Sequence, residues 1–344
     1  MGRLRLGFIG CGGQASLLQA SLPLVDTIDF VATCDLDRAK AERNARRFGA
    51  TDVYTDFREM IAVQAPDAVA IVGPPQMHHE LGLACLDLGC HIFLEKPPAL
   101  SAAQTKELAD AAARAGKMGM VATHWRHAPA HQMARRLAEE PEFGQVLSFR
   151  CKYAAPGPKS GIWGTDSAVR GYLLGQVIHP VDCMRFLVGS EVAEVYAAIA
   201  ERAPGAGDGS DGTTSYAISF RFQSGAVGTM NLFGGTHTLM METAIIGASG
   251  RAIEVEEAAR LRYFKEQPPL GKGDYIDTPS ISWTQGNLYR GYARPGYLEE
   301  LQHFAAALLA GEQPRASLED AWQDMRVLEA IIESNASKAP VSLA

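Results

Sequence analysis

The stretch Leu6-Gly7-Phe8-Ile9-Gly10-Cys11-Gly12-Gly13-Gln14-Ala15 decides the fold. The apolar run 4–9 predicts a short strand, and residues 14–22 have the pattern of a helix. Between them, Gly10, Gly12 and Ala15 have the G-x-G-x-x-A spacing of a dinucleotide-binding turn. The first glycine permits the tight turn, the second lets a pyrophosphate approach the backbone, and Ala15 lets helix and strand pack closely. We therefore expect residues 10–15 to contact a dinucleotide at a helix N-terminus.

Asp35 supplies the acidic residue that completes this fingerprint. It ends the second predicted strand, residues 30–34, about 20 residues past Ala15, which is the expected offset. A carboxylate at this position accepts hydrogen bonds from the ribose hydroxyls of NAD and repels a 2′-phosphate. The sequence therefore favours NAD as cofactor over NADP. NADP stays an alternative because Arg38 lies nearby, and an arginine at such a place can accommodate the 2′-phosphate.

Strand and helix patterns alternate over the first third of the chain. Apolar strands at 68–72, 91–94 and 118–122 are separated by predicted helices, the last two at 79–88 and 102–115, which indicates a doubly wound parallel sheet, a Rossmann fold. From about residue 124, longer segments alternate polar and apolar residues, which favours an α+β domain with an open antiparallel sheet. We expect a loop at 204–212, irregular structure at 266–296, and two closing helices at 297–310 and 317–334.

The expected organisation is thus a cofactor-binding domain over residues 1–123 and a substrate and oligomerisation domain over residues 124–344. A chain of 344 residues suits two domains. The closing helices are expected to pack back toward the first domain.

Composition and charge exclude several classes of protein. A net charge of −7 argues against a nucleic-acid partner, and no apolar run reaches the length of a membrane span. The N-terminus enters the first strand directly, without a signal-peptide pattern, so a cytoplasmic location is expected. The six cysteines have neither Cys-x-x-Cys nor zinc-ligand spacing, so we expect reduced, buried thiols and no metal.

Two further residues have side chains suited to proton transfer. Lys96, in Glu95-Lys96-Pro97, follows a predicted strand at the carboxyl edge of the wound sheet, where ligands bind in such folds. Taken locally, the motif also fits a surface charge pair. His179 enters a predicted helix, with Asp182 three residues later. An apolar stretch with one histidine also fits a core histidine, with Asp182 as a first-turn acid.

Together these motifs resemble the glucose–fructose oxidoreductase and inositol dehydrogenase family, often called Gfo/Idh/MocA, over nearly the whole chain. Glu95-Lys96-Pro97 is similar to its most specific signature. The segment Gly73-Pro74-Pro75-Gln76-Met77-His78 is similar to its cofactor loop, with Gly73 where threonine is usual. The segment from Val121 to Pro129 is similar to its strand-end segment with an arginine and a proline three apart, and His179-x-x-Asp182 to the motif of its active-site histidine.

The resemblance implies a set of roles. Lys96 and His179 would be catalytic, the Lys96–Pro97 bond would be cis, and the second domain would form a homodimer or homotetramer through its sheet. The residues implied to bind the cofactor beyond the glycine turn and Asp35 are Gly73, Pro74, His78, Glu95, Lys96 and Arg126.

The chain departs from the family pattern at Gly175. Many family dehydrogenases carry an acid four residues before the histidine, and here Gly175 and then Gln176 stand at that point. A histidine that acts as a base needs a group to fix its ring and tautomer. We expect this group to be Asp182 or Asp166, with the Gln176 amide or a water as weaker options.

The sequence predicts an NAD-dependent oxidoreductase acting on a hydroxyl of a sugar, inositol or related polyol. The expected substrate wall consists of Arg126, Trp163, Gln176 and Asp182, although Trp163 equally fits a buried structural role.

Two alternatives to this function stay open. One is a glycosidase or lyase of the same fold that retains its NAD. The other is a non-catalytic cofactor-sensing regulator, which Gly175 favours and Lys96 with His179 disfavours.

Overall fold

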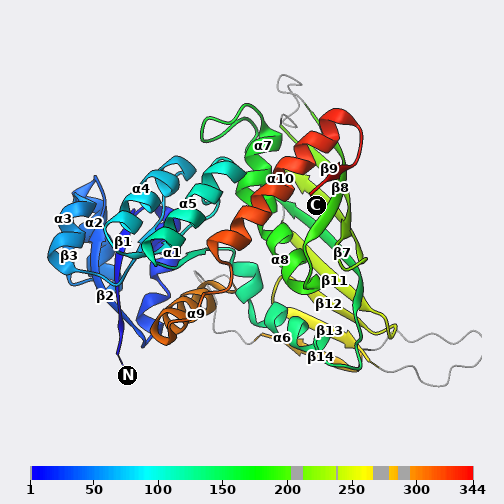
Figure 1. The fold of residues 1–344 in the computed structure, drawn as a ribbon, viewed down its shortest axis with the longest axis horizontal. Coiled ribbons are helices and arrows are strands. Elements are labelled where there is room, and N and C mark those ends of the chain that lie inside the picture. The colour runs from blue at the N-terminus through cyan, green and yellow to red at the C-terminus, as the bar shows by residue number, and fades with distance from the viewer. Residues whose placement is uncertain (1, 203–211, 238, 266–278, 286–294, 344) are drawn as a thin grey trace, which may run out of the picture. The chain divides into compact units, whose positions relative to one another are not determined.

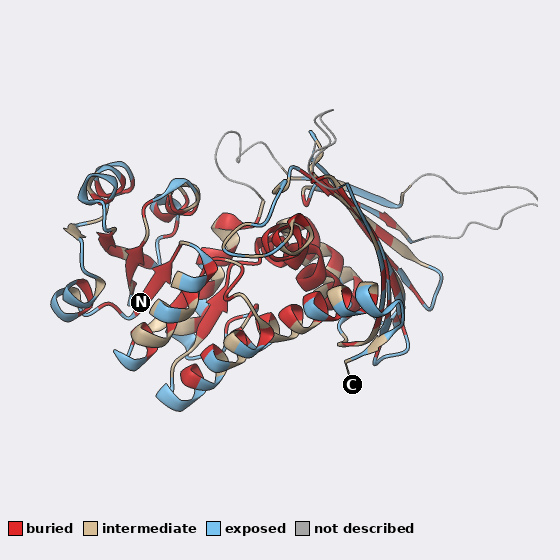
Figure 2. Cartoon of the chain, turned by 90° about the horizontal axis from the view of Figure 1, so that it is seen from above, coloured by how far each residue is buried: buried red, intermediate tan, exposed pale blue. Residues whose placement is uncertain are grey.

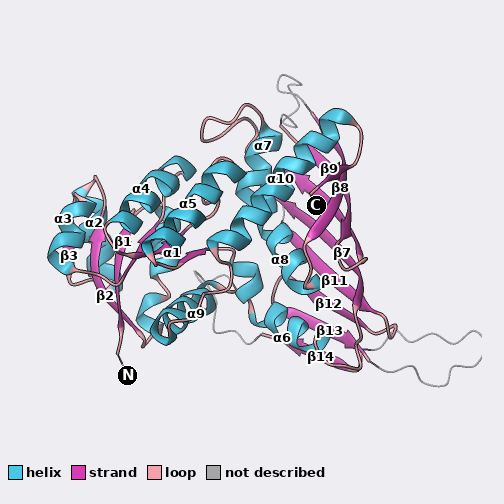
Figure 3. Cartoon of the chain, viewed as in Figure 1, coloured by secondary structure: helices cyan, strands magenta, loops and turns pink. Residues whose placement is uncertain are grey.

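A computed structural model describes residues 2–202, 212–237, 239–265, 279–285 and 295–343 of the chain. The chain divides into two compact units, one with residues 1–124 and 288–325, the other with residues 125–287 and 326–344. Figure 1 labels the elements of both units, and Figure 3 separates helices from strands. Helix α10, Leu318–Ser337, contributes residues to both units.

The first unit contains a six-stranded sheet in the order β3-β2-β1-β4-β5-β6. All neighbouring strands are parallel, so the predicted wound sheet is confirmed. The order reverses between β1 and β4, and a ligand in such folds binds beside the carboxyl ends of the strands at that point. The strands are β1 Leu4–Ile9, β2 Ile28–Cys34, β3 Asp52–Tyr54, β4 Ala68–Ile71, β5 His91–Leu94 and β6 Gly119–Val121.

The described residues of this unit form six α-helices in addition to the start of α10. They are α1 Gly13–Gln19, α2 Arg38–Phe48, α3 Phe57–Gln64, α4 Pro75–Asp87, α5 Ala102–Ala115 and α9 Tyr297–Ala310. Helix α4 begins four residues before the predicted start at residue 79. Pro75 lies in its first turn, where the missing N–H needs no partner, so a proline can open the helix here.

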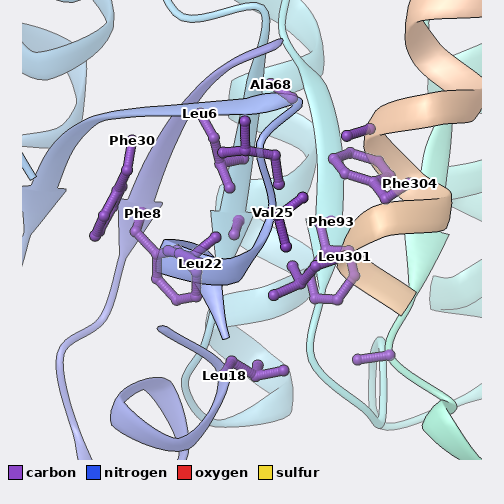
Figure 4. Packing of buried hydrophobic residues seen from close by; sticks show 14 of the residues in the cluster. Leu6, Phe8, Leu18, Leu22, Val25, Phe30, Ala68, Phe93, Leu301 and Phe304 are labelled. Atoms are coloured by element: carbon purple, nitrogen blue, oxygen red, sulfur yellow. The ribbon is translucent and has the colours of Figure 1, made fainter. Parts of the chain in front are cut away.

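Alternate residues of the strands pack into two cores on opposite faces of this sheet. Leu6 and Phe8 of β1 belong to one core and Ile9 to the other. The first core is closed by α9, since Phe304 packs edge-to-face on Phe93 of β5 at 5.4 Å between ring centroids (Figure 4). Helices α3, α4 and α5 supply the second core. The last helix before α10 thus secures the sheet that carries the glycine turn.

The second unit contains a nine-stranded sheet in the order β14-β13-β12-β11-β7-β10-β9-β8-β15. Its strands are β7 Val146–Ala155, β8 Val192–Glu201, β9 Thr214–Phe222, β10 Val227–Gly234, β11 Met240–Gly247, β12 Ala252–Glu256, β13 Arg260–Phe264, β14 Ile281–Thr284 and β15 Val341–Ser342. The pair β7–β10 is parallel and the other neighbouring pairs are antiparallel, so the predicted antiparallel sheet is confirmed, with one parallel pair at its centre.

Two predicted irregular segments have different outcomes. Strand β14 lies within 266–296, so that segment is not wholly irregular; β14 pairs with β13 at the sheet edge. The loop expected at 204–212 lies outside the described residues except for residue 212.

Helices α6, Pro129–Ala138, α7, Ala168–Tyr172, and α8, Ile178–Val188, lie on one side of this sheet. Side chains of β9 and β10 alternate between buried and exposed, so the opposite face of the sheet is largely open to solvent (Figure 2). In the described part of the chain, no helix combines the length and apolar character that crossing a bilayer requires.

Candidate functional site

The glycine turn after β1 leaves room for a ligand. Gly10 has φ +94°, and a Cβ there would lie 2.0 Å from the carbonyl oxygen of Val72, so only glycine fits. A Cβ on Gly12 or Gly13 would meet nothing within 4 Å, which means that space is open beside the backbone at both positions. Ala15 is buried against the sheet. The geometry leaves room for a ligand at this turn, and the contact of residues 10–15 with a dinucleotide stays a prediction.

Asp35 fixes the same turn from the end of β2. Its Oδ2 accepts a hydrogen bond from the N–H of Cys11 at 2.8 Å, and its Oδ1 accepts one from the N–H of Asp37 at 2.9 Å. The Cys11 side chain is buried, so this residue contributes its backbone to the turn and not its thiol. Arg38, the residue that kept NADP open, bonds the carboxylate of Glu42 on its own helix at 3.1 Å.

A cleft of about 840 Å³ opens beside this turn within the first unit. Sequence reasoning found the part of its lining that belongs to recognised motifs, namely Gly10, Gly12, Asp35, Gly73 and Pro74. It missed an apolar part, formed by Leu36, Phe57, Met77 and Leu81 among others. Leu36, directly after the strand-end acid, is 94% exposed, which is unusual for a leucine in such a position. This exposure would have indicated the wall, but it can be seen only in the structure and not in the sequence.

The loop after β4 replaces the usual threonine of the family motif by Gly73. A Cβ on Gly73 would lie 2.4 Å from the Sδ of Met77, so the methionine side chain occupies the place of the missing side chain. His78 follows in the first turn of α4 and is 0% exposed.

Glu95, Lys96 and Pro97 follow β5, and the Lys96–Pro97 peptide bond is cis, as the family resemblance implied. Glu95 is 4% exposed, and its Oε1 accepts a hydrogen bond from Nε2 of Gln14 at 2.7 Å. The same Nε2 lies 3.1 Å from the hydroxyl of Tyr297 at the start of α9. Gln14 therefore links the glycine turn to the strand end that carries Lys96.

His179 lies in the second unit, in the first turn of α8. A π-helical turn over Leu173–Val177 precedes it, a form that is frequent at functional sites. The His179 ring stacks on Trp125 with centroids 5.8 Å apart and planes inclined by 12°. Trp125 also stacks with His131 at 6.3 Å and 19°. The indole is thus a feature of the His179 environment that the sequence did not indicate.

The position of the missing acid faces an aromatic ring. A Cβ on Gly175 would lie 3.5 Å from the Trp163 ring. Trp163 has φ +54°, a conformation that a bulky residue rarely adopts. Gln176 points elsewhere, since its Oε1 accepts the hydroxyl proton of Tyr153 at 2.7 Å.

Asp182 binds Arg126, although we expected it as a candidate partner of His179. Nε of Arg126 donates to Oδ2 at 2.8 Å, and a second guanidinium nitrogen donates to Oδ1. Arg126 is 5% and Asp182 0% exposed, so the two side chains form a buried ion pair, and their expected contact with a substrate stays a prediction. Asp166, the other acidic candidate, is exposed.

Family comparisons agree with these observations. Residues 4–123 match the model GFO_IDH_MocA, described as an oxidoreductase family with an NAD-binding Rossmann fold. Residues 131–253 match the GFO/IDH/MocA C-terminal domain. The chain belongs to the Gfo/Idh/MocA oxidoreductase family.

Curated members of this family act on sugars and inositols by name. Levoglucosan dehydrogenase of Pseudarthrobacter phenanthrenivorans is 28% identical over 100% of this chain and 99% of its own. Myo-inositol 2-dehydrogenase of Thermotoga maritima is 26% identical over 92% of each chain. D-glucoside 3-dehydrogenase of Escherichia coli is 30% identical, and there the match spans about half of each protein, 54% of both.

Solved structures of family members superpose on nearly the entire chain. A dehydrogenase from Chromobacterium violaceum has a TM-score of 0.88 at 26% identity, covering 98% of this chain and 96% of its own. Levoglucosan dehydrogenase in complex with NADH and L-sorbose has a TM-score of 0.84 at 25% identity, covering 100% of both chains. Among the described residues of the present chain, no group of three or more His, Cys, Asp or Glu side chains could hold a metal ion.

Proposed function

We propose that this protein transfers a hydride between NAD and a hydroxyl or carbonyl group of a sugar, inositol or related polyol. The observation that carries the proposal is the first unit's sheet. At the carboxyl end of β1 the chain forms a glycine turn held by Asp35, and Lys96 follows the carboxyl end of β5. The curated relatives named above support the substrate class.

The residues of the first unit fit a dinucleotide. The open space beside Gly12 and Gly13 admits a pyrophosphate to the backbone, and the cleft offers an apolar wall for a nucleoside. The fixed carboxylate of Asp35 suits ribose hydroxyls. Since Arg38 is bonded to Glu42, these contacts support NAD over NADP.

NAD supplies the hydride chemistry, and the protein has to orient the substrate and move its proton. In the oxidative direction, we assign to His179 the removal of the hydroxyl proton and to Lys96 the stabilisation of developing negative charge. The parallel indole of Trp125 holds the His179 ring in one plane.

Trp163 and Gln176 remain our candidates for the substrate wall. Trp163 lies over Gly175, one turn before His179, and an indole offers an apolar face on which a sugar ring can stack. The left-handed conformation of Trp163 supports a functional role, since strain of this kind concentrates at ligand sites.

We also propose a homodimer or homotetramer that uses the open face of the nine-stranded sheet. That face carries a hollow of about 600 Å³ lined by Arg150, Lys152, Tyr196, Asn231 and Glu242 among others. A cytoplasmic location is proposed on the six free, buried cysteines, which suit a reducing compartment.

The test is a panel of sugars, inositols and sugar acids with NAD, followed by NADH absorbance. On any active compound, Lys96→Ala should lower turnover by about 10² or more while leaving NAD affinity and thermal stability intact. Lys106→Ala is the matched control, because Lys106 lies on α5 and pairs with Asp110 at the surface. Equal turnover in the Lys96 variant would remove that residue from the mechanism. NADH that forms and is reoxidised within one turnover would instead indicate the retained-NAD glycosidase or lyase.

A further inference from the structure

The imidazole of His78 joins two loops that leave neighbouring strands of the first unit's sheet. Its Nε2 accepts a hydrogen bond from the N–H of Gly73 at 2.9 Å, and its Nδ1 lies 2.8 Å from the carbonyl oxygen of Pro97. Gly73 follows β4 and Pro97 follows β5, and these strands pair in parallel register. The ring is 0% exposed. It therefore lies behind both loops and not on their solvent side.

These two contacts fix the protonation state of the ring. The N–H of Gly73 can only donate, so Nε2 carries no proton, and the carbonyl of Pro97 can only accept, so Nδ1 carries one. Burial lowers the pKa of His78 to about 4, and the positive charge of Lys96 acts in the same direction. The imidazole is consequently neutral and in a single tautomer at pH 7.

The backbone on both sides of Lys96 is tied to β4 or α4. Before it, the N–H of Glu95 donates to the carbonyl oxygen of Ile71 at 3.0 Å. After it, the carbonyl of Pro97 accepts from His78. Removing the imidazole would release the second tie and would leave the Gly73 N–H without its acceptor.

We propose that His78 is a positioning residue that holds the Gly73 loop and the Lys96 turn in register with each other for the cofactor. This replaces the direct cofactor contact expected from the sequence, because both ring nitrogens bond to backbone and the ring has no exposed surface. The proposal rests on the proposed function, in which both loops face NAD.

Two substitutions at position 78 and one control test it. His78→Leu removes both hydrogen bonds, whereas the amide of His78→Gln can still donate to Pro97 and accept from Gly73. His91→Leu is the control at the opposite end of β5, where Nδ1 of His91 accepts a hydrogen bond from the N–H of Met118 at 2.9 Å. It removes a comparable bond far from the strand end that carries Lys96.

The first readout needs no cofactor. Nitrogen NMR of the His78 ring at pH 7 should show a protonated Nδ1 and an unprotonated Nε2. The second is the dissociation constant of NADH, followed by its fluorescence. We expect His78→Leu to weaken NADH binding about tenfold, since a buried donor loses its acceptor, and His78→Gln to restore most of it. His91→Leu should lower the melting temperature without changing NADH affinity.

Turnover adds a third readout on any substrate that the panel identifies. In His78→Leu it should fall by more than the cofactor affinity does, because the turn that carries Lys96 is released as well.

The possible outcomes separate this proposal from the proposed function. NADH affinity equal in His78→Leu and wild type, an equal loss in His91→Leu, or a proton on Nε2 each overturns the role of His78. Failure of the wild-type protein to bind NADH overturns the proposed function, while the ring spectrum still tests the two hydrogen bonds. If His78→Leu does not fold, an NADH affinity of His78→Gln far below that of wild type contradicts the proposal.

Discussion

The carboxylate of Asp35 holds the glycine turn and is also expected to bind the ribose of the cofactor. Its two oxygens accept hydrogen bonds from the backbone of Cys11 and Asp37, which closes the turn around Gly10. Each carboxylate oxygen has a further lone pair, so the same side chain can also accept from ribose hydroxyls. The choice between NAD and NADP should therefore depend both on the negative charge of Asp35 and on the position in which the turn holds it.

Substitution of Asp35 separates the two tasks. Asp35→Asn removes the negative charge and keeps one of the two acceptors for the turn. Because repulsion of a 2′-phosphate is lost, the ratio of NADH affinity to NADPH affinity should fall about tenfold. Asp35→Ala should narrow the preference too and also lower the melting temperature. Fluorescence titrations with both reduced cofactors measure the ratio. A wild-type preference for NADPH would refute the assignment.

Site residues whose contacts lie close in sequence could be predicted, whereas those whose partners lie far along the chain could not. The glycine turn and Asp35 could be predicted because a tight turn and a strand-end acid leave local spacing signals. The partner of Asp182 could not, because Arg126 is 56 residues away and His179 is only three. Sequence proximity pointed only to His179, and the same limit hid the stacking of Trp125 on His179.

Among the elements, α8 depends on one buried ion pair. Arg126 precedes α6 and Asp182 lies in α8, so their two hydrogen bonds hold the segment before α6 to that helix. The guanidinium also lies 5.7 Å from the ring centroid of Phe186 in α8. A charge that loses its partner in such a place is costly, whereas loss of both charges is not.

Arg126→Met should therefore destabilise the second unit by about 3–5 kcal/mol, since it leaves a buried carboxylate unpaired. The double variant Arg126→Met/Asp182→Leu should recover much of that loss. Urea unfolding measures both. Arg221→Ala, which opens an exposed pair with Glu194 in the second unit, should leave the unfolding midpoint unchanged. A double variant as unstable as Arg126→Met would show that the loss comes from packing.

Element types were easier to predict than their partners. The apolar alternation of β7 and β10 is the same whether two strands run parallel or antiparallel, so only the structure reveals their parallel pairing. Strand β14 is short, and its neighbours in sequence carry scattered glycine and proline, so it has no usable signal. Helix α5, by contrast, matched its predicted bounds of 102–115, because its charged and apolar residues repeat with helical period.

At the scale of the whole molecule, a fully buried histidine with a lowered pKa is found in each unit. His78 lies in the first unit and His131 in the second, and burial lowers the pKa of each to about 4. His131 is held between the Trp125 carbonyl and the hydroxyl of Thr243. Both rings are therefore neutral in the folded chain at pH 7.

This arrangement predicts acid sensitivity in both units. In the unfolded chain these histidines bind a proton below about pH 6.5, whereas in the folded chain they do so only near pH 4. Between these values the unfolded state holds more protons, so stability falls as pH falls and levels off below about pH 4.

Each histidine should contribute up to roughly 3 kcal/mol of this loss. Urea unfolding at several pH values should give a shallower pH dependence for His78→Gln in the first unit and for His131→Gln in the second. An unchanged slope in either variant would contradict the assignment for that unit.

The buried cysteines have a practical consequence for labelling chemistry. All six thiols are free and buried, and burial raises the pKa of Cys11 and of Cys34 to about 12. Only a thiolate reacts readily with a maleimide, so the native side chains should stay silent toward such reagents. A single cysteine introduced at an exposed position away from the cleft, such as Val63 on α3, would then take up a dye alone. The protein is thus suited to site-specific fluorescence without first removing its own sulfur.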